Sequence, residues 1–255
     1  MRIVVTQVTR MKDSRICVAG VDCDSGCNVR PEPRQGEPHL SVDDLDTRAG
    51  GLFGLGKVID LGPVVTRSDP PHTEDRLYFR KEATAVQAMA GPEFWDLVQK
   101  RVKPSLSDCF GPSLSKSGKT CAMAKGTGEV SLGYLKLHGK AKVVPREDVK
   151  KAYLHWRCAS FGDLETALTD LRFFSVPDFD LKAPLLEEAN RRLSAGAPAV
   201  LGLGLSRAFA GGDFKEKRHW LQINGLYFEE DFAAAISGTR LSAATLGRAL
   251  FHGKG

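Results

Sequence analysis

The chain opens with two β-rich runs, Arg2-Ile-Val-Val-Thr-Gln-Val-Thr9 and Arg15-Ile-Cys-Val-Ala-Gly-Val21. The first run alternates apolar and polar residues, which is the pattern of a strand with one buried face. The pair Asp13-Ser14 between the two runs favours a turn. Together these residues predict a β-hairpin at the start of the fold.

Outward from this hairpin, short runs of the same kind recur and are separated by turn-forming residues. They predict strands at 56–62, 76–79, 129–137, 152–159, 164–169, 199–205 and 219–223. Segment 28–38 is rich in Pro and Arg, and segment 105–128 is rich in Gly, Ser and Lys. Both compositions are typical of loops, so we interpret these two segments as loops.

Helices are expected at only a few places. Ser41 with Asp44 three residues later predicts a short helix with a capped start. Pro92 suits the first turn of a helix near 92–103 that ends before Pro104. Two further helices are predicted at 184–193 and 241–251.

Length and composition fit two small β domains. The chain has 255 residues, including 26 Gly and 13 Pro, and one domain takes roughly 100–200 residues. Many short elements joined by turns indicate a mainly β fold, a β-barrel class with a few helices. We predict two tandem OB-like barrels, because the OB-fold is a five-stranded barrel of this size. The predicted domains are 1–140, with the helix near 92–103 inserted, and 141–255, with a helical tail.

Membrane segments and cofactor motifs are not expected. No run approaches the ~20 apolar residues of a membrane span, and residues 1–6 lack the apolar core of a signal peptide. The run Gly50–Gly56 follows a predicted helix and enters a strand, which is the reverse of a dinucleotide-binding turn. Ser113 occupies the position where a phosphate-binding loop ending at Gly118-Lys119-Thr120 needs glycine. The sequence therefore predicts a cytoplasmic protein with no membrane contact and no cofactor.

The six cysteines do not form a strong metal motif. Cys23 and Cys27 are spaced as half of a zinc site, and Cys17 or His39 could supply a third ligand. A zinc knuckle needs a second such pair, which the sequence does not provide nearby. Free thiols and no metal site are expected.

The stretch from Lys116 to Arg157 carries ten Lys and Arg residues against three acidic residues. This local excess is larger than the net charge of the whole chain, +5. Clustered cations attract phosphates, and neighbouring aromatic rings stack on the bases of single strands. A solvated connector with Trp156 in the core is the alternative interpretation. The nucleic-acid-binding candidates are Lys136, Lys140, Lys142, Lys150, Lys151, Trp156 and Arg157.

Two shorter motifs carry polar groups suited to a ligand. The segment His72-Thr73-Glu74-Asp75 could contact a ligand, perform acid–base chemistry or simply form a rigid turn. Around Trp220 the sequence alternates, which places Trp220, Gln222 and Asn224 on one side of a strand, where they could stack on and hydrogen-bond a base. An ordinary outward-facing strand is the alternative.

Several segments in order also resemble a known family. They are Arg15–Gly20 with Val29–Pro31, Pro71–Asp75, Phe94–Pro112, Gly126–Gly133, and Leu168–Phe173 with Trp220–Gly225. Their order and spacing, over roughly residues 1–230, are similar to the dual OB-containing domain of bacteria. The resemblance implies two OB barrels, a setting near prokaryotic defence genes and a role in binding nucleic acids or nucleotides, with no catalytic residues. The ligand-contact candidates within these segments are Arg30, His72, Thr73, Glu74, Asp75, Arg172, Trp220 and Gln222.

The function expected from these features is a non-catalytic nucleic-acid or nucleotide binding module that serves a defence system. The first alternative is an adaptor whose barrels dock a partner enzyme encoded nearby. The second alternative is a nucleotide-processing enzyme that uses His72, Glu74 and Asp75, although no nucleophile, metal set or phosphate loop accompanies these residues.

Overall fold

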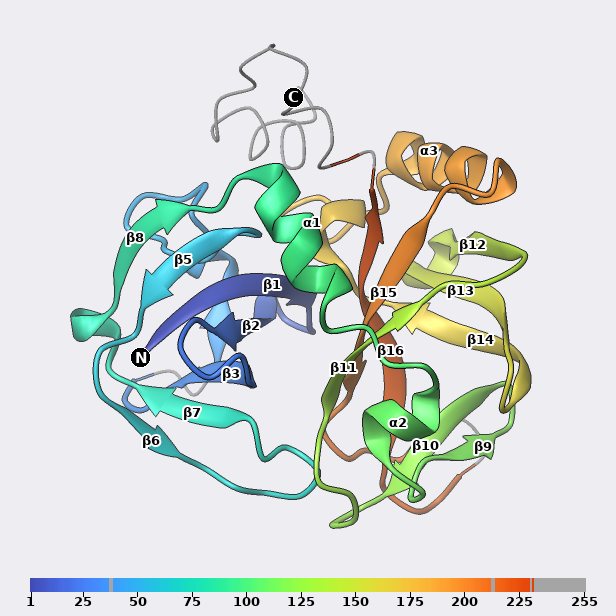
Figure 1. Cartoon of the computed structure of the whole chain (residues 1–255), viewed down its shortest axis with the longest axis horizontal. Helices are drawn as coiled ribbons and strands as arrows, with labels where there is room; N and C mark the ends of the chain where they lie inside the picture. Colours follow the sequence, from blue (N-terminus) through green and yellow to red (C-terminus); the bar gives the residue numbers. More distant parts are fainter. Residues whose placement is uncertain (37–38, 212–213, 230, 232–255) are drawn as a thin grey trace.

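Two curled, half-barrel sheets lie side by side in the computed structural model (Figure 1). The structure describes residues 1–36, 39–211, 214–229 and 231. The chain is mainly β, as the sequence predicts. Strands from the first part of the chain make one sheet, and strands from Ser115 onward make the other.

The first sheet follows the order β6-β7-β3-β2-β1-β5-β8, with β4 paired to β2. The predicted hairpin is confirmed, because β1 and β2 pair antiparallel from Ile3 opposite Asp22 to Arg10 opposite Ile16. Among the described strands of this sheet, β3 and β7 are the one pair that runs parallel. The strand bounds are β1 Arg2–Arg10, β2 Arg15–Asp22, β3 Asn28–Pro33, β4 Leu40–Ser41, β5 Lys57–Asp60, β6 Val64–Thr66, β7 Asp75–Tyr78 and β8 Thr84–Ala88.

The second sheet follows the order β11-β15-β16-β14-β13-β12, extended by β10 on β16 and β9 on β10. The strand β16 therefore pairs with three neighbours at different points along its length. This branching lets the sheet curl around its own core. The bounds are β9 Ser115–Ser117, β10 Thr120–Ala124, β11 Leu132–Lys136, β12 Ala141–Arg146, β13 Lys151–Cys158, β14 Gly162–Leu168, β15 Ala199–Leu205 and β16 Arg218–Phe228.

Helices cover the ends and the junction of the two sheets (Figure 1). The helices α1 (Gly91–Gln99) and α3 (Ala183–Ser194) lie where the sequence predicts them. The predicted capped turn is present as a 3₁₀ helix, Val42–Asp44, with a capping box between Ser41 and Asp44. The tail helix predicted at 241–251 falls outside the described residues. Within those residues, no helix is long and apolar enough to cross a membrane.

Two segments interpreted as loops contain regular structure, so those predictions are wrong. Segment 28–38 begins with β3, whose parallel partner β7 is more than forty residues further along the chain. Segment 105–128 contains the short helix α2 (Leu106–Phe110) and the strands β9 and β10. β10 pairs with β16, far away in sequence, and β9 pairs with β10, so local composition gives no sign of this part of the sheet.

The two sheets divide the chain earlier than the boundary predicted at 140/141. The strands β9, β10 and β11 all precede residue 140 and are hydrogen-bonded within the second sheet. The helices α1 and α2 occupy the stretch between the last strand of the first sheet and β9.

The two halves share a buried interface in which β1 crosses the outer face of β16 and β15. Val4 packs there with Tyr134, Val200 and Tyr227 in one apolar cluster. The Tyr227 hydroxyl donates to the backbone carbonyl of Thr6. Tyr134 and Thr6 share a hydrogen bond of 2.6 Å between their hydroxyl oxygens.

Two glycines make room for this contact. A Cβ atom at Gly225 would lie 1.9 Å from the Tyr227 hydroxyl oxygen, and one at Gly202 would lie 3.0 Å from the same ring. The Tyr227 ring therefore lies over bare backbone and reaches β1. Larger residues at these positions would push the ring away from Thr6.

Candidate nucleic-acid interface

The outer face of β12, β13 and β14 carries three of the six predicted cations, Lys142, Lys151 and Arg157. On β13 the core side carries Ala152, Leu154, Trp156 and Cys158, and the other side carries Lys151, Tyr153, His155 and Arg157. Opposite these residues, Lys142 of β12 lies against His155. We call this surface the basic face; it consists of Lys142, Arg146, Lys151, Tyr153, His155, Arg157, Asp163 and Glu165.

Cations outnumber carboxylates on the basic face. Glu165 is the more buried of its two carboxylates, with 14% of its side chain exposed. Arg146 donates to Glu165 at 2.7 Å, and Lys119 Nζ and His155 Nε2 lie 3.6 and 3.5 Å from the same carboxylate. Lys142, Lys151 and Arg157 are exposed and form no ion pair with any other described residue. Their charge is therefore free to attract an anion.

Trp156 does not belong to this surface. Its side chain is 4% exposed, and its indole Nε1 donates to the Thr166 hydroxyl at 3.0 Å inside the core. Successive residues of a strand point to opposite faces, so Trp156 and Arg157 cannot share one. The alternative interpretation of Trp156 as a core residue therefore holds.

The ring-bearing residues of this face are Tyr153, one of the aromatic residues interleaved with the cations in the sequence, and His155, which sequence reasoning missed. Tyr153 is half-buried, and the Arg146 guanidinium carbon lies 4.7 Å from the centre of its ring. The signal was available, because Tyr153 and His155 are in phase with Lys151 and Arg157 along the strand. The period of two identifies which aromatic residue shares a face with the cations.

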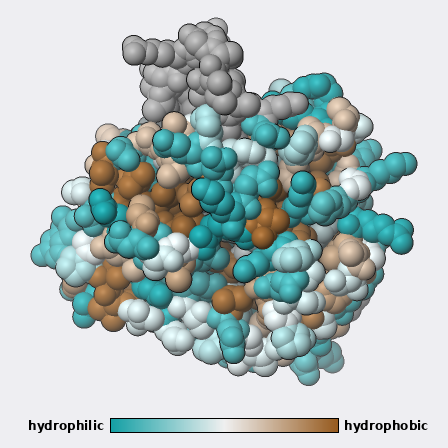
Figure 2. All heavy atoms as spheres, in the orientation of Figure 1, coloured by the Kyte–Doolittle hydropathy of each residue, from teal (hydrophilic) through white to brown (hydrophobic). Residues whose placement is uncertain are grey.

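The other predicted lysines lie at the edges of the second sheet. Lys136 ends β11, and Lys140 precedes β12; both are exposed. Lys150 is exposed in the turn before β13 and forms an ion pair of 2.6 Å with Asp180. Hydrophilic side chains project from the side of the molecule on which β12 to β14 lie (Figure 2).

Trp220 and Gln222 lie on the same face of the second sheet as Tyr153. The pairing explains this placement, because Gln222 lies opposite Ala167 of β14, which lies opposite Tyr153 of β13. Trp220 precedes Gln222 by two residues and so shares its side of β16. Its ring is half-buried beside Phe209 and Phe214, and its Nε1 donates to the Phe209 carbonyl at 3.0 Å.

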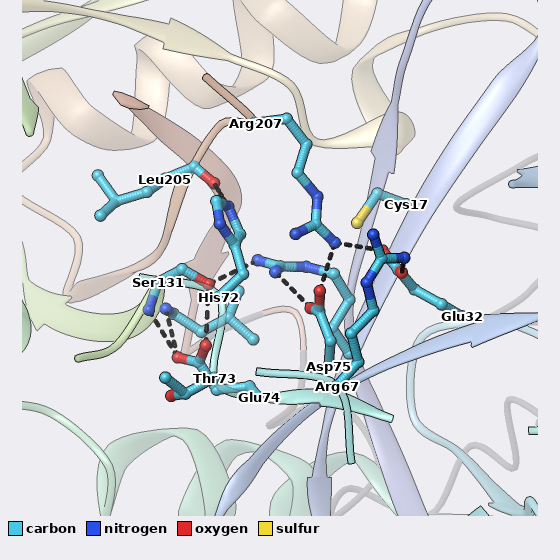
Figure 3. A network of polar contacts seen from close by, with 12 residues as sticks. Cys17, Glu32, Arg67, His72, Thr73, Glu74, Asp75, Ser131, Leu205 and Arg207 are labelled. Atoms are coloured by element: carbon cyan, nitrogen blue, oxygen red, sulfur yellow. Dashed lines mark hydrogen bonds and ion pairs between the residues drawn. The ribbon is translucent and has the colours of Figure 1, made fainter. Parts of the chain in front are cut away.

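Arg30, His72, Glu74 and Asp75 belong to a buried polar region between the two halves, with Thr73 at its edge (Figure 3). The Asp75 carboxylate is fully buried and accepts from Arg30 at 2.9 Å and from Arg207 at 2.6 Å. Arg207 also pairs with Glu32, which Arg67 approaches to 3.4 Å. Arg30 comes from β3 and Arg207 from the chain after β15, so Asp75 links the first half to the second.

Glu74 binds the buried edge of the second sheet at the start of β11. Its Oε1 atom accepts from the backbone N–H groups of Ser131 and Leu132 at 2.7 and 3.0 Å. Its Oε2 atom accepts from the Ser131 hydroxyl at 3.0 Å. The Thr73 hydroxyl donates to the Glu129 carbonyl at 2.5 Å. Glu74 and Thr73 thus provide hydrogen-bond partners for backbone groups of residues 129–132, at the edge of the sheet. This role is structural.

His72 and His219 lie together behind this network. Their ring centres are 5.0 Å apart. His72 Nε2 is 3.1 Å from the Leu205 carbonyl oxygen, and His219 Nδ1 is 2.8 Å from the Ser206 carbonyl oxygen. Burial, together with the nearby Arg30 and Arg207 charges, lowers the pKa of His72 to about 3. His72 is therefore neutral near pH 7 and poorly suited to accept a proton in catalysis.

Arg172 is likewise part of the interior. Its guanidinium bonds both carboxylate oxygens of Asp170 and donates to the Leu226 carbonyl at 2.8 Å. The guanidinium carbon lies 5.1 Å from the centre of the Tyr227 ring. Arg172 is 6% exposed, so it does not face solvent; its bonds connect the turn at Asp170 to β16.

The cysteines are unpaired in the structure. Cys23 and Cys27 are exposed, Cys17 is half-buried, and the other three are buried. Burial raises the pKa of the Cys109 and Cys121 thiols to about 12, so both stay protonated at neutral pH. Among the described residues, no group of three His, Cys, Asp or Glu side chains is arranged to hold a metal ion.

Comparison with known proteins gives no relative: no protein-family model matches the chain, and no curated protein matches it significantly.

Proposed function

We propose that the protein binds single-stranded nucleic acid on the basic face. The observation that carries the proposal is the placement of unpaired Lys142, Lys151 and Arg157 around the Tyr153 ring on one sheet surface. Cations that follow a phosphate backbone beside rings that stack on bases are the usual means of holding single strands. The same sheet surface continues through Ala167 to Gln222 and Trp220, which extends the path available to a strand.

This proposal includes two finer statements. We infer that the two half-barrels are OB-like, since small barrels of that class bind oligonucleotides on an outer strand surface. We also propose a non-catalytic role, in which the protein supplies a binding module to a bacterial defence system, as the resemblance to the dual OB-containing family implies. His72, Glu74 and Asp75 are buried, and both carboxylates are bonded to other groups of the protein, which argues against catalysis by these residues.

The test is a fluorescence-anisotropy titration with labelled DNA and RNA strands of about 16 nucleotides. The variant Lys142→Glu/Lys151→Glu/Arg157→Glu should bind far more weakly than the parent protein. If each lost cation removes one phosphate contact, the slope of log affinity against log salt should fall in magnitude by about 2.

The matched control is Lys12→Glu/Lys81→Glu/Lys100→Glu. These three lysines are exposed in the first half of the chain, so the control changes the net charge equally. Equal weakening by both variants would indicate a nonspecific charge effect and would contradict the proposal. If neither strand type binds at low salt, the adaptor role becomes the better hypothesis.

A further inference from the structure

Two buried histidines carry ring nitrogens that no group in the described part of the chain satisfies. His72, in the segment before β7, is 1% exposed, and His219, on β16, is 4% exposed. Their ring centres lie 5.0 Å apart, and the ring planes are tilted by 60°, so the rings are not stacked. The orphaned atoms are His72 Nδ1 and His219 Nε2, one on each ring. A buried polar atom without a partner needs a physical explanation.

The other nitrogen of each ring fixes the form of the imidazole. His72 Nε2 faces the Leu205 carbonyl oxygen (Figure 3), and His219 Nδ1 faces the Ser206 carbonyl oxygen. A carbonyl oxygen only accepts, so each of these nitrogens carries the ring proton. In the neutral rings, His72 Nδ1 and His219 Nε2 therefore each carry a bare lone pair. A neutral imidazole whose N–H group bonds a backbone carbonyl is the usual form of a histidine that binds a metal.

A thioether lies beside the two rings. Met123 of β10 is directly opposite His219 of β16, and residues in that relation share a face of the sheet. A Cβ atom at Gly128 would overlap Met123 Sδ and lie 3.3 Å from Pro71 Cβ. Pro71 immediately precedes His72, so the thioether lies next to the segment that carries that ring. Met123 is 1% exposed, so side chains from three separate stretches of the chain meet in one buried place.

The separation of the two rings suits a single bound ion. A metal ion lies about 2.0–2.1 Å from a ligating imidazole nitrogen, which is about 3.2 Å from the centre of the ring. Two rings whose centres are 5.0 Å apart can therefore meet one ion at an angle of about 100°. A bent pair of nitrogens leaves a third position for a sulfur ligand.

The donor set selects the kind of ion. Two imidazoles and one thioether are neutral, and within the described ranges no third His, Cys, Asp or Glu completes a site here. The charges of Arg30 and Arg207 act on His72, so a doubly charged ion without an anionic ligand would be costly to bury there. Thioether sulfur is a soft ligand that selects copper(I), and imidazole also binds copper. Zinc, by contrast, is held in structural sites by four ligands.

We propose that His72, His219 and Met123 bind one copper(I) ion between the two halves of the chain. His72 Nδ1 and His219 Nε2 supply two lone pairs, and Met123 Sδ supplies the third. The carbonyl oxygens of Leu205 and Ser206 hold the rings in place. The inference does not depend on the basic face, because the two sites share no residue. The alternative occupant is a buried water molecule that donates to both nitrogens.

The experiment is a titration of the full chain with copper(I), under anaerobic conditions with ascorbate, in competition with a coloured copper(I) chelator. The Cys23→Ser/Cys27→Ser variant serves as the parent, because these exposed thiols would otherwise compete for the ion. Copper is added both to the folded protein and during refolding from urea, since the nitrogens are buried. One ion per chain is expected. The X-ray absorption spectrum of the bound copper should show nitrogen and sulfur ligands together.

Met123→Leu should weaken binding by about tenfold or more, because it removes the sulfur while nearly keeping the volume of the side chain. His219→Gln should weaken binding by about a hundredfold or more, since losing a ligand should exceed the 10–100-fold cost of losing a ligand's hydrogen-bond partner. Because Met123→Leu conserves volume, it keeps the test valid if His219→Gln does not fold. The matched controls are Met89→Leu and His155→Gln, which lie outside the site and should bind as the parent does.

Three results would overturn the inference. The first is that the chelator retains all the copper from both folded and refolded protein, which would leave water as the occupant. The second is an affinity that stays unchanged in both Met123→Leu and His219→Gln. The third is a spectrum with sulfur ligands alone, which would place the ion on the remaining cysteines.

Discussion

The buried network and the basic face use the same kinds of side chain in opposite ways. In the network three arginines pair with the carboxylates of Glu32 and Asp75, Glu74 accepts from Ser131 and Leu132, and the Asp75 carboxylate is fully buried between two of the arginines. On the basic face four Lys and Arg residues meet two carboxylates, and three of the cations lack an ion-pair partner among the described residues. Matched charge inside joins the halves, whereas unmatched charge outside is left for a ligand. The network residues are Arg30, Arg67, Arg207, Glu32, Glu74 and Asp75.

The largest expected effect is on the network side of this comparison. Asp75→Ala should lower the free energy of unfolding by roughly 3–5 kcal/mol, because it leaves the buried Arg30 guanidinium without its carboxylate and frees Arg207. Chemical denaturation with urea measures this loss. The control Asp163→Ala, at an exposed carboxylate of the basic face, should change stability by less than about 0.5 kcal/mol. Equal losses of unfolding free energy in the two variants would show that buried, paired carboxylates contribute no more to stability here than exposed ones.

The next effect depends on pH. The pKa of His72 is about 3 in the folded protein and about 6.5 in an unfolded chain. Below pH 6.5 the unfolded state binds a proton that the folded state rejects, so stability falls as pH decreases. The loss should approach about 2 kcal/mol between pH 6.5 and pH 5. Urea denaturation across this range should show a shallower decline for His72→Gln, and equal slopes would exclude this source of pH dependence.

Smaller changes in stability and in affinity should distinguish Trp156 from Tyr153, the two aromatic residues of β13 that lie on opposite faces. Trp156→Phe should cost about 1–3 kcal/mol of stability, because the Thr166 hydroxyl loses its buried donor, and should leave nucleic-acid affinity unchanged. Tyr153→Ala should do the reverse and weaken binding by about 1–3 kcal/mol if a base stacks on that ring. Denaturation and anisotropy, measured on both variants, test this reversal. A loss of affinity in Trp156→Phe alone would contradict the assignment of faces.

The smallest effect is expected at the exposed thiols. Cys23→Ser/Cys27→Ser should change stability by less than about 0.5 kcal/mol, because both side chains are exposed and no third metal ligand lies beside them in the described residues. Thermal unfolding with and without a chelator is the measurement. A chelator-sensitive transition in the parent protein, lost in the double variant, would show that these thiols do hold a metal.

Local patterns were enough to predict the hairpin, α1, α3 and most strands of the second sheet. They were not enough for β3 and β10, which have partners distant in sequence, or for β9, which pairs only with β10. For the site, clustering in sequence correctly identified Lys142, Lys151 and Arg157 as exposed cations but grouped them with Trp156, which the strand period places on the opposite side. The pairing of Gln222 with Ala167 places the Trp220 motif on the same sheet surface as the cations of β13. The order of the strands in the sheet was needed to recognise this.

The buried state of His72, Glu74 and Asp75 also lay beyond sequence reasoning. A run of polar residues after two prolines reads as a surface turn, because charged groups are rarely buried without partners. Their partners are Ser131, Leu205 and Arg207, which the chain supplies much later. Whether such a cluster is exposed depends on contacts with residues far away in sequence, which a short segment of sequence does not include.

The contact between Thr6 and Tyr227 has a consequence for how the protein is made. The two residues are 221 positions apart in sequence, so the first sheet emerges from the ribosome long before β16 exists to cover β1. At about 5–20 residues per second, that interval lasts on the order of ten seconds or more. During this time the apolar surface around Val4 lacks its native cover. We expect this nascent half to be a chaperone substrate, with high contact order making the final docking step slow.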